Sequence, residues 1–445
     1  MADVHYHSIR FDADRCNGCM SCLRVCPTQA IRVRRARAVM LGDRCIDCSE
    51  CMRVCNRSAI VPLTASLDQL ARFDCTVAIP SPALYTQFET IVTPGTILRA
   101  LENVGFEGAA TLSRGCGAVT RAIEYFVGEY RGQFPLISSF CPSVVRLVQV
   151  RYPDLLPQLM PILSPREVVA REAKQTWAAA TGLPPARIGT VYVTPCPAKM
   201  MSIVDHPGMV SSFIDSAVAI TDVFPLLSAT IRDVQTSGVK VDELETAAGL
   251  GWAFSIGLPS SLPAEDTLGV WGLPNVVRLL DDVEKGKLQR YAFIECHACP
   301  EGCVSGSLTV ENPYVARARA VRLQQSLPRR DLIDEAEMRA SYKRGEFHTS
   351  APFVAMPPAP LDREIGGAIA RLKERDRTVE HLPQIDCGAC GAPTCVAFAE
   401  DVVTGEVDET ECVFVREGRV AAVVRQLAGL LAPQGRTYSR MEDLP

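Results

Sequence analysis

The chain has 445 residues, which is enough for about two to four domains of ordinary size. Its 46 Lys and Arg residues nearly balance its 51 Asp and Glu residues, and it has no long basic block, so nothing favours nucleic acid or an anionic membrane as a partner. The N-terminal residues lack the apolar core of a signal peptide, and no apolar run approaches the roughly 18–20 residues of a membrane span. We therefore expect a soluble, cytoplasmic protein without a membrane span.

Nineteen cysteines are present, and they are grouped. Eight lie within residues 16–55 and four within residues 387–412. A reducing compartment argues against a disulfide framework, so metal clusters explain this usage better.

The first predicted unit is an internal repeat of the pattern C-x2-C-x2-C-x3-C, in 16-CNGCMSCLRVCP-27 and 45-CIDCSECMRVCN-56. This is the pattern of two-cluster ferredoxins, in which the fourth cysteine of each motif binds the other cluster. Zinc, which takes one set of four ligands per site, does not account for two interleaved sets. The first cluster is assigned to Cys16, Cys19, Cys22 and Cys55, and the second to Cys45, Cys48, Cys51 and Cys26.

Between the two motifs, residues 30–41 indicate a β-hairpin with solvated arginines. From about residue 68 to 345, short apolar strands alternate with amphipathic helices, which predicts an α/β core. Strands are expected in 74–81, 189–196 and 291–296, and helices in 115–130 and 167–182. Ligands gather where the strands of such folds end, and Cys196 and Cys299 each follow a predicted strand. The spacing from Cys299 to Cys303 suits one face of a helical turn.

A proline-rich segment at 351–361 indicates a linker. Beyond it, a C-x2-C-x4-C-x16-C pattern with interspersed glycines predicts one more cubane. Its ligands would be Cys387, Cys390, Cys395 and Cys412. The amphipathic run 413–431 is expected to pack on its own small domain, with docking of a partner as the alternative.

Three segments together resemble the H-cluster loops of [FeFe]-hydrogenases: 138-SSFCPSVVRLVQVRYPDLL-156, 194-TPCPAKM-200 and 295-ECHACPEGCVSG-306. The phrases VVRLVQVRYP, TPCPAK and SLTVENPYVARAR are similar to the divergent, sensory branch of that family. The resemblance implies an α/β fold with a two-lobed H-cluster-type domain, an α+β two-cluster ferredoxin domain and a small, mainly helical [4Fe–4S] domain. The implied boundaries are 1–65 for the ferredoxin domain, 68–345 for the H-cluster-like domain, 346–370 for the linker and 371–435 for the C-terminal domain.

In that family, four cysteines hold a cubane, and the last of them bridges it to a diiron subsite with CO and cyanide ligands. The matching positions here are Cys141, Cys196, Cys299 and the bridging Cys303. Lys199 matches the lysine that pairs with a cyanide ligand, and a buried ammonium group needs such an anion. The alternative for Lys199 is an ordinary surface lysine.

The sequence departs from the family's proton route. Phe140 stands where active enzymes carry a relay cysteine, and a phenyl ring neither donates nor accepts a proton. By the same alignment, the route's serine becomes Met160 and its glutamates become Thr120 and Ile123, with Glu124 one position away. Because general acid–base assistance is worth about 10²–10⁴-fold, we expect slow or absent turnover.

Other positions near the implied subsite also differ. Thr194 and His297 each replace a methionine, and the run 305-SGS-307 replaces a glycine-rich one, which adds bulk near the cluster. His297 is a candidate proton donor, or a residue that fills space and bonds a carbonyl. Cys116 and Cys296 are expected to be small buried residues rather than ligands or relays.

Two functions from different classes follow. The first is a hydrogen or redox sensor, or slow hydrogenase, that passes electrons along accessory [4Fe–4S] clusters to a redox protein or a signalling regulator supplied in trans. The second is an electron-transfer protein that has lost the diiron subsite. Cys303 and Lys199 favour the first, whereas Phe140, Thr194 and Ser307 favour the second. A standard hydrogen-producing enzyme ranks third.

Overall fold

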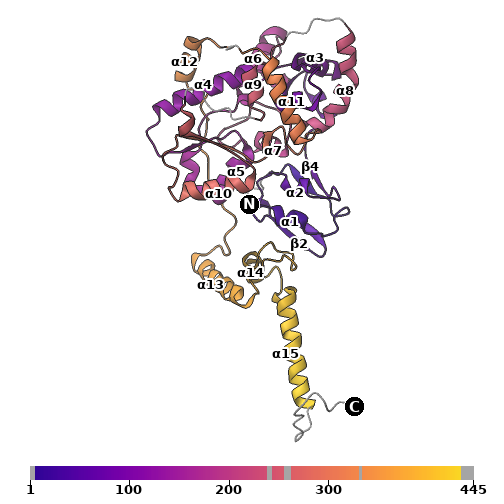
Figure 1. Cartoon of the computed structure of the whole chain (residues 1–445), viewed down its shortest axis with the longest axis vertical. Coiled ribbons are helices and arrows are strands. Elements are labelled where there is room, and N and C mark those ends of the chain that lie inside the picture. The colour runs from indigo at the N-terminus through magenta and orange to yellow at the C-terminus, as the bar shows by residue number, and fades with distance from the viewer. Residues whose placement is uncertain (1–5, 238–242, 255–261, 330–332, 432–445) are drawn as a thin grey trace. The chain divides into compact units, whose positions relative to one another are not determined.

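A computed structural model describes residues 6–237, 243–254, 262–329 and 333–431 (Figure 1). By their internal contacts these residues form two compact units. The larger unit comprises residues 6–15, 25–30 and 41–358, and the smaller one comprises residues 16–24, 31–40 and 359–431. The division at 358 falls inside the segment expected to be a linker.

The first lobe of the larger unit is built on a four-stranded parallel sheet with the order β6-β5-β8-β9. Every residue of the central strands β5 and β8 is buried, as expected where helices cover both faces of a parallel sheet. The strands are β5 (Cys75–Pro80), β6 (Gly108–Ala109), β8 (Ile188–Thr194) and β9 (Ser216–Ala219).

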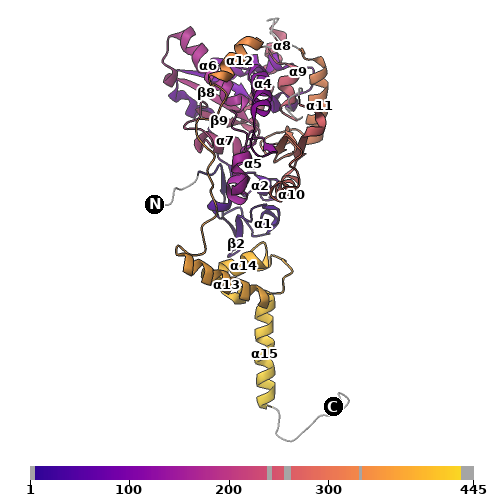
Figure 2. The ribbon, with the colours of Figure 1, turned by 90° about the vertical axis from the view of Figure 1, so that its left-hand side faces the viewer.

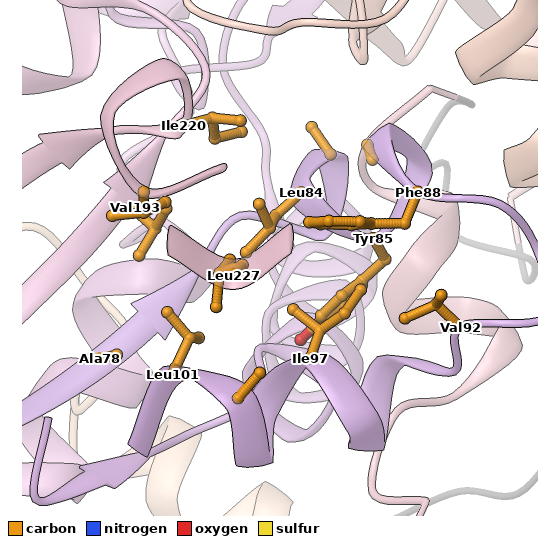
Figure 3. Close-up of a cluster of buried hydrophobic side chains, with 14 of the residues drawn as sticks. Ala78, Leu84, Tyr85, Phe88, Val92, Ile97, Leu101, Val193, Ile220 and Leu227 are labelled. Carbon is orange, nitrogen blue, oxygen red and sulfur yellow. The ribbon is translucent and has the colours of Figure 1, made fainter. Parts of the chain in front are cut away.

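Alternate residues of β5 point to opposite faces of this sheet. Ala78 packs with α3 (Pro94–Val104) and α8 (Ile220–Thr236), in the core that Figure 3 shows around Leu101 and Leu227. Val77 and Ile79 pack with residues of α6 (Pro165–Thr181) on the other face.

The second lobe has a three-stranded parallel sheet with the order β10-β11-β7. On one face, Ile294 packs with α5 (Pro142–Arg151) and α10 (Leu273–Glu284); on the other, Phe293 packs with α4 (Ser113–Glu129) and α12 (Glu335–Lys343). The strands are β7 (Leu136–Ile137), β10 (Thr267–Trp271) and β11 (Phe293–His297). Two lobes, each with its own sheet, confirm the expected two-lobed α/β domain.

The strands expected in 74–81, 189–196 and 291–296 are β5, β8 and β11, and the two expected helices are α4 and α6. Capping explains the bounds of α6. Pro165 occupies its first turn, and Gly182 ends it with φ of 71°, a conformation that favours glycine. The remaining helices of this unit include α7 (Pro197–Val204), α9 (Ala247–Gly251) and α11 (Pro313–Ser326).

The ferredoxin-like elements are short. In the larger unit, β1 (Ile9–Phe11) pairs antiparallel with β4 (Ile60–Pro62), and α2 (Glu50–Arg53) lies within the second cysteine motif. In the smaller unit, β2 (Ile31–Arg34) and β3 (Arg37–Met40) form the expected antiparallel hairpin. The helix α1 (Ser21–Val25) lies within the first motif.

The expectation of solvated arginines in this hairpin is wrong for Arg32, which is 3 % exposed. Its Nε donates to Asp401 Oδ2 at 2.6 Å, and Arg34 also pairs with Asp401. The β2 strand bonds the C-terminal cysteine loop as well, since Val33 N donates to Gly391 O at 2.8 Å. A side chain at residue 391 would collide with Val33 O, at 2.0 Å from its Cβ, so glycine is required there.

The C-terminal part of the smaller unit is mainly helical, as expected, with α13 (Ile365–His381), α14 (Cys395–Val403) and α15 (Val413–Leu431). α13 and α14 enclose a small core, which Val415 of α15 joins. Beyond that first turn, α15 runs away from α13 and α14 (Figure 2), and Val420, Leu427 and Leu430 are 57 %, 52 % and 82 % exposed. The expectation that 413–431 packs on its own domain is therefore wrong for most of the helix.

Candidate metal centre

The four cysteines Cys141, Cys196, Cys299 and Cys303 lie at the ends of secondary-structure elements. Cys141 is the N-cap of α5 and Cys196 the N-cap of α7, each followed by a proline in the first helical turn. Cys299 comes directly before the short strand β12 (Pro300–Cys303), and Cys303 is the last residue of that strand. The sequence had suggested a helical turn here. Gly302 has φ of 75°, which turns the chain back between the two cysteines.

The structure brings these four thiols together. Burial raises the pKa of Cys196, and the neighbouring Cys303 and Cys141 raise it further. Burial also raises the pKa of Cys299, which feels all three of the other thiols. Four converging thiols, two of them at helix N-termini that favour negative charge, fit a [4Fe–4S] cubane. Such a cluster would supply one-electron redox chemistry when bound.

Lys199 of α7 is buried against Cys303. Its Nζ lies 3.2 Å from Cys303 Sγ, and the side chain is not at the surface, which excludes the ordinary surface lysine. Burial acts to lower the pKa of Lys199, but Cys303 and Cys196 outweigh it and hold that pKa well above its usual value. Burial acts to raise the pKa of Cys303, but Lys199 and His297 lower it to about 6.

His297, at the end of β11, lies between Cys303 and Glu295. Its Nε2 is 2.7 Å from Glu295 Oε1, and Glu295 is 4 % exposed. Burial alone would lower the pKa of His297, but Cys303 and Glu295 raise it to about 10. Its partner is thus a carboxylate and not a backbone carbonyl. Sequence reasoning missed Glu295, although it lies in the quoted 295-ECHAC segment.

A cavity of about 60 Å³ adjoins Cys303. Lys199, His297 and Glu295 line its polar side. Phe140 lines it too and packs edge-on against Trp252, with ring centroids 5.1 Å apart. Phe140 therefore offers an apolar wall at the position expected to carry a relay.

The other positions of the aligned proton route do not offer titratable groups to this cavity. Met160 and Ile123 are buried in an apolar core, and Thr120 donates to Cys116 O at 2.9 Å. Glu124 pairs instead with Arg121, at 3.0 Å. The positions that depart from the family's proton route in the sequence therefore also lack a proton-carrying group at this cavity in the structure.

A second buried carboxylate, Glu245, was also missed. It accepts a hydrogen bond from Thr111 Oγ1 at 2.5 Å and another from Ser113. Burial raises the pKa of Glu245 to about 7, although these hydrogen bonds oppose the shift. Cys116, which is 1 % exposed and lines the cavity, feels the charge of Glu245. No local pattern points to Glu245, because it lies far from every cysteine motif.

Cys296 is a core residue. It is 1 % exposed and belongs to the apolar cluster between α5 and α10. Burial raises its pKa strongly, so it is neutral at ordinary pH. This agrees with the expectation of a small buried residue.

The serines of the 305–307 run do not crowd the cysteines. Ser305 Oγ donates to Gly302 O at 2.9 Å, within its own loop, and Ser307 Oγ lies 2.7 Å from Ser49 Oγ. The residue that cannot change is Gly306, whose Cβ would lie 2.1 Å from Pro195 O. The close backbone approach in this loop therefore depends on Gly306.

The ferredoxin cysteines also gather in sets. In the larger unit, burial raises the pKa of Cys45 and Cys48; Asp47 and neighbouring thiols raise that of Cys45 further, and neighbouring thiols that of Cys48. The set that interacts is the one predicted for the second cluster, namely Cys26, Cys45, Cys48 and Cys51. In the smaller unit, Cys22 interacts with Cys16 and Cys19, and Ala38 N donates to Cys16 Sγ at 3.3 Å.

The four C-terminal cysteines line one small pocket. Gly388 and Gly391 have φ of 77° and 80°, which lets the loop wrap closely. The thiols are Cys387, Cys390, Cys395 and Cys412. The arrangement fits a further [4Fe–4S] cluster.

Comparisons with known proteins agree with this architecture. The family model described as the iron-only hydrogenase large subunit, C-terminal domain, matches residues 74–256 and 264–307. A 4Fe–4S dicluster domain model matches residues 8–56, and an Fe–S cluster model matches residues 382–414. Iron–sulfur clusters are thus supported at both ends of the chain.

Two curated relatives are hydrogenases. Iron hydrogenase 1 of Clostridium pasteurianum is 27 % identical over 165 residues, which cover 35 % of this chain and 28 % of that protein. The periplasmic [Fe] hydrogenase large subunit of Nitratidesulfovibrio vulgaris is 28 % identical over 383 residues, covering 70 % of this chain and 88 % of that protein. The chain thus spans less than a third of the Clostridium relative.

Among solved structures, apo [FeFe]-hydrogenase HydA1 from Chlamydomonas reinhardtii matches with a TM-score of 0.48 at 17 % identity. The match covers 66 % of this chain and 97 % of that one. Separately, within the described residues, we find no helix with the length and apolar character to cross a membrane.

Proposed function

Because this chain belongs to the iron-only hydrogenase large-subunit family, we propose that it is a hydrogen or redox sensor, or a slow hydrogenase, that passes electrons along accessory [4Fe–4S] clusters. The proposal assigns four cubanes to the sixteen predicted ligand cysteines. It places a diiron subsite with CO and cyanide ligands next to Cys303, where that group would supply the chemistry of hydrogen activation when bound.

The pairing of Lys199 with Cys303 carries this proposal. Lys199 has three N–H donors, of which one faces Cys303 Sγ, and the ammonium group also lines the cavity. Burying an ammonium group is costly unless anionic groups surround it, and the Cys303 sulfur faces one of the three donors of Lys199. An anionic ligand in the cavity would give the other donors a partner.

Slow turnover is proposed because the cavity wall at Phe140 is apolar. Proton movement needs groups within hydrogen-bond reach of one another, and Phe140 and Met160 offer none. His297 interacts with Cys303 on one side and with Glu295 on the other. They would hold or move a proton at the His297 ring and the Glu295 carboxylate.

Infrared spectroscopy of the protein matured with the diiron cofactor tests this function. CO and cyanide bands should appear, and hydrogen should shift them. Cys303→Ala should abolish the bands, whereas the matched control Cys296→Ala should keep them. Full iron loading without CO or cyanide bands would overturn the proposal.

The second candidate is an electron-transfer iron–sulfur protein without the diiron subsite. The small cavity and the Phe140 wall favour it. It predicts the same cubane content with no CO or cyanide bands, so the same experiment decides between the two.

The proposed output is a redox protein or signalling regulator in trans, in the cytoplasm. Support comes from α15, whose apolar residues Val420, Val423 and Leu427 are more than half exposed. An exposed apolar stripe on a helix suits the groove of a partner protein.

A further inference from the structure

Arg53, in the last turn of α2, contacts the loop of the central cysteines. Its Nη2 lies 3.4 Å from Cys299 Sγ, and it also donates to Ser305 O. Its Nε donates to Glu50 Oε1 at 3.0 Å, which holds the guanidinium group in place. Arg53 follows Cys51, a predicted ligand of the second ferredoxin cluster, by two residues.

A second contact fixes the same pair of segments. Ser49, which is 1 % exposed, lies between Cys48 and Glu50 and bonds Ser307 through the two hydroxyl groups at 2.7 Å. Residues 49–53 are therefore anchored to residues 299–307 at two points. The serine at 307, which seemed from the sequence to crowd the cluster, serves as one of these anchors.

We propose that Arg53 is a positioning residue that raises the reduction potential of the central cubane and fixes the path by which the second ferredoxin cluster reduces it. The proposal rests on the proposed function only in requiring that the central cubane exists. In the step concerned, one electron leaves the second ferredoxin cluster, which is oxidised, and enters the central cubane, which is reduced. No bond forms or breaks, and the electron comes originally from a low-potential carrier protein.

The physical reason is the charge of Arg53. A cubane becomes more negative when it gains an electron, so a cation bonded to a ligand sulfur stabilises the reduced state more than the oxidised one. Arginine keeps its charge at any ordinary pH, and its planar fork reaches Cys299 Sγ and Ser305 O at once. A lysine would keep the charge but reach only as a single point.

The test is a redox titration followed by electron paramagnetic resonance, on the full chain reconstituted with cubanes but without the diiron cofactor. The signal of the central cubane is the one that Cys299→Ser removes. Arg53→Gln should lower the reduction potential of the central cubane. The expected shift changes its reduced-to-oxidised ratio at least tenfold, which corresponds to about 59 mV for one electron. Arg53→Lys should recover at least half of that shift.

Arg57→Gln is the matched control, because it removes the same charge from an exposed arginine four residues away. It should leave the central potential unchanged. Equal potentials in Arg53→Gln and Arg57→Gln would overturn the role of Arg53, as would a failure of Arg53→Lys to recover the potential.

If Arg53→Gln fails to bind the central cubane, Arg53→Lys and Ser307→Ala decide. Ser307→Ala removes the second anchor and leaves the charge of Arg53 in place. It should increase hydrogen exchange in residues 49–53 and 299–307 without a tenfold change in the reduced-to-oxidised ratio of the central cubane. If Ser307→Ala shifts the reduction potential of this cubane more than Arg53→Lys does, the charge mechanism is contradicted. Missing CO and cyanide bands after maturation would sink the proposed function alone, because this titration uses protein without the diiron cofactor.

Discussion

Lys199 Nζ lies 3.2 Å from Cys303 Sγ, and Lys199 is buried with only 7 % of its surface exposed. The two residues lie 104 positions apart in the sequence. Each shifts the ionisation of the other, so the pair can be examined even in protein that lacks clusters.

The first prediction concerns the ionisation of Cys303 in cluster-free protein. Its pKa is lowered to about 6 from an ordinary value of 9.0, so the thiolate is present at pH 7. Iodoacetamide should therefore modify Cys303 at pH 7, and the rate should fall as the pH drops through 6. Lys199→Met should move this transition upward by one pH unit or more.

The control for this prediction is Lys343→Met, at an exposed lysine of α12. Its modification profile should follow that of the wild type. The lowered pKa also affects the stability of the cluster-free protein. Because folding lowers the pKa of Cys303, its thiolate contributes to the free energy of unfolding above about pH 9, and this contribution is lost as the pH falls through 6. Identical profiles for Lys199→Met and wild type would contradict the pairing.

The second prediction is the iron content. Anaerobic reconstitution should give about sixteen irons per chain, from four clusters of four. Cys299→Ser should lose about four irons. Cys296→Ala, three residues away in the apolar core, should lose none. Saturation at about eight irons, with the central thiols still free, would remove the central cluster from the assignment.

The sequence predicted most of the local structure because the signals were periodic. The buried strands β5, β8 and β11 are short apolar runs with turn residues after them, and α4 and α6 have amphipathic patterns. The spacing of the cysteine motifs is also local, and it grouped Cys26, Cys45, Cys48 and Cys51, whose thiols interact in the structure.

The missed features are long-range contacts. Arg32 looked like a solvated hairpin arginine, because nothing in its neighbourhood indicates Asp401, 369 residues away. Glu245 and Cys116 meet only through the packing of α9 on α4. Arg53 could not be connected with Cys299 for the same reason, since a local pattern contains no information about tertiary partners.

The third prediction concerns Phe140. In protein with infrared-verified diiron cofactor, Phe140→Cys should raise hydrogen turnover, by up to about 10²-fold, because it adds a proton donor at the cavity wall. Phe140→Ala is the control, since it removes the ring from Trp252 without adding a donor. Met160 is buried in the apolar core and should limit the gain. Equal turnover in both variants would assign proton movement to another route, such as His297.

The fourth prediction is a pH dependence of stability at Glu245. Burial raises its pKa to about 7 from 4.5, so the neutral carboxyl group is favoured in the folded protein. Its contribution is fully present below about pH 4.5 and lost as pH rises through 7. The free energy of unfolding of Glu245→Gln, measured relative to the wild type, should therefore be higher at pH 8 than at pH 5, by about 1–3 kcal/mol.

This change is measured by urea unfolding at the two pH values, with hydrogen exchange of α4 and α9 as the local readout. Glu265→Gln, at an exposed residue of the same unit, should show no such difference. A Glu245→Gln variant with the pH profile of wild type would mean that the buried carboxyl group titrates as it does in water.

The last prediction concerns Asp401 in the smaller unit. Asp401 is 8 % exposed and neutralises Arg32, which is 3 % exposed, and it also pairs with Arg34. Removing one partner of a buried ion pair leaves an uncompensated charge and costs about 3–5 kcal/mol. Asp401→Asn should therefore raise hydrogen exchange in β2, β3 and α14 together, since those elements share the contact. Asp376→Asn, whose carboxylate is 65 % exposed and pairs only at the surface with Arg375, should leave these segments protected. If Asp401→Asn exposes α14 alone while β2 keeps its protection, the ion pair does not hold the hairpin against the C-terminal cysteine loop, and the bond from Val33 N to Gly391 O would have to do so instead.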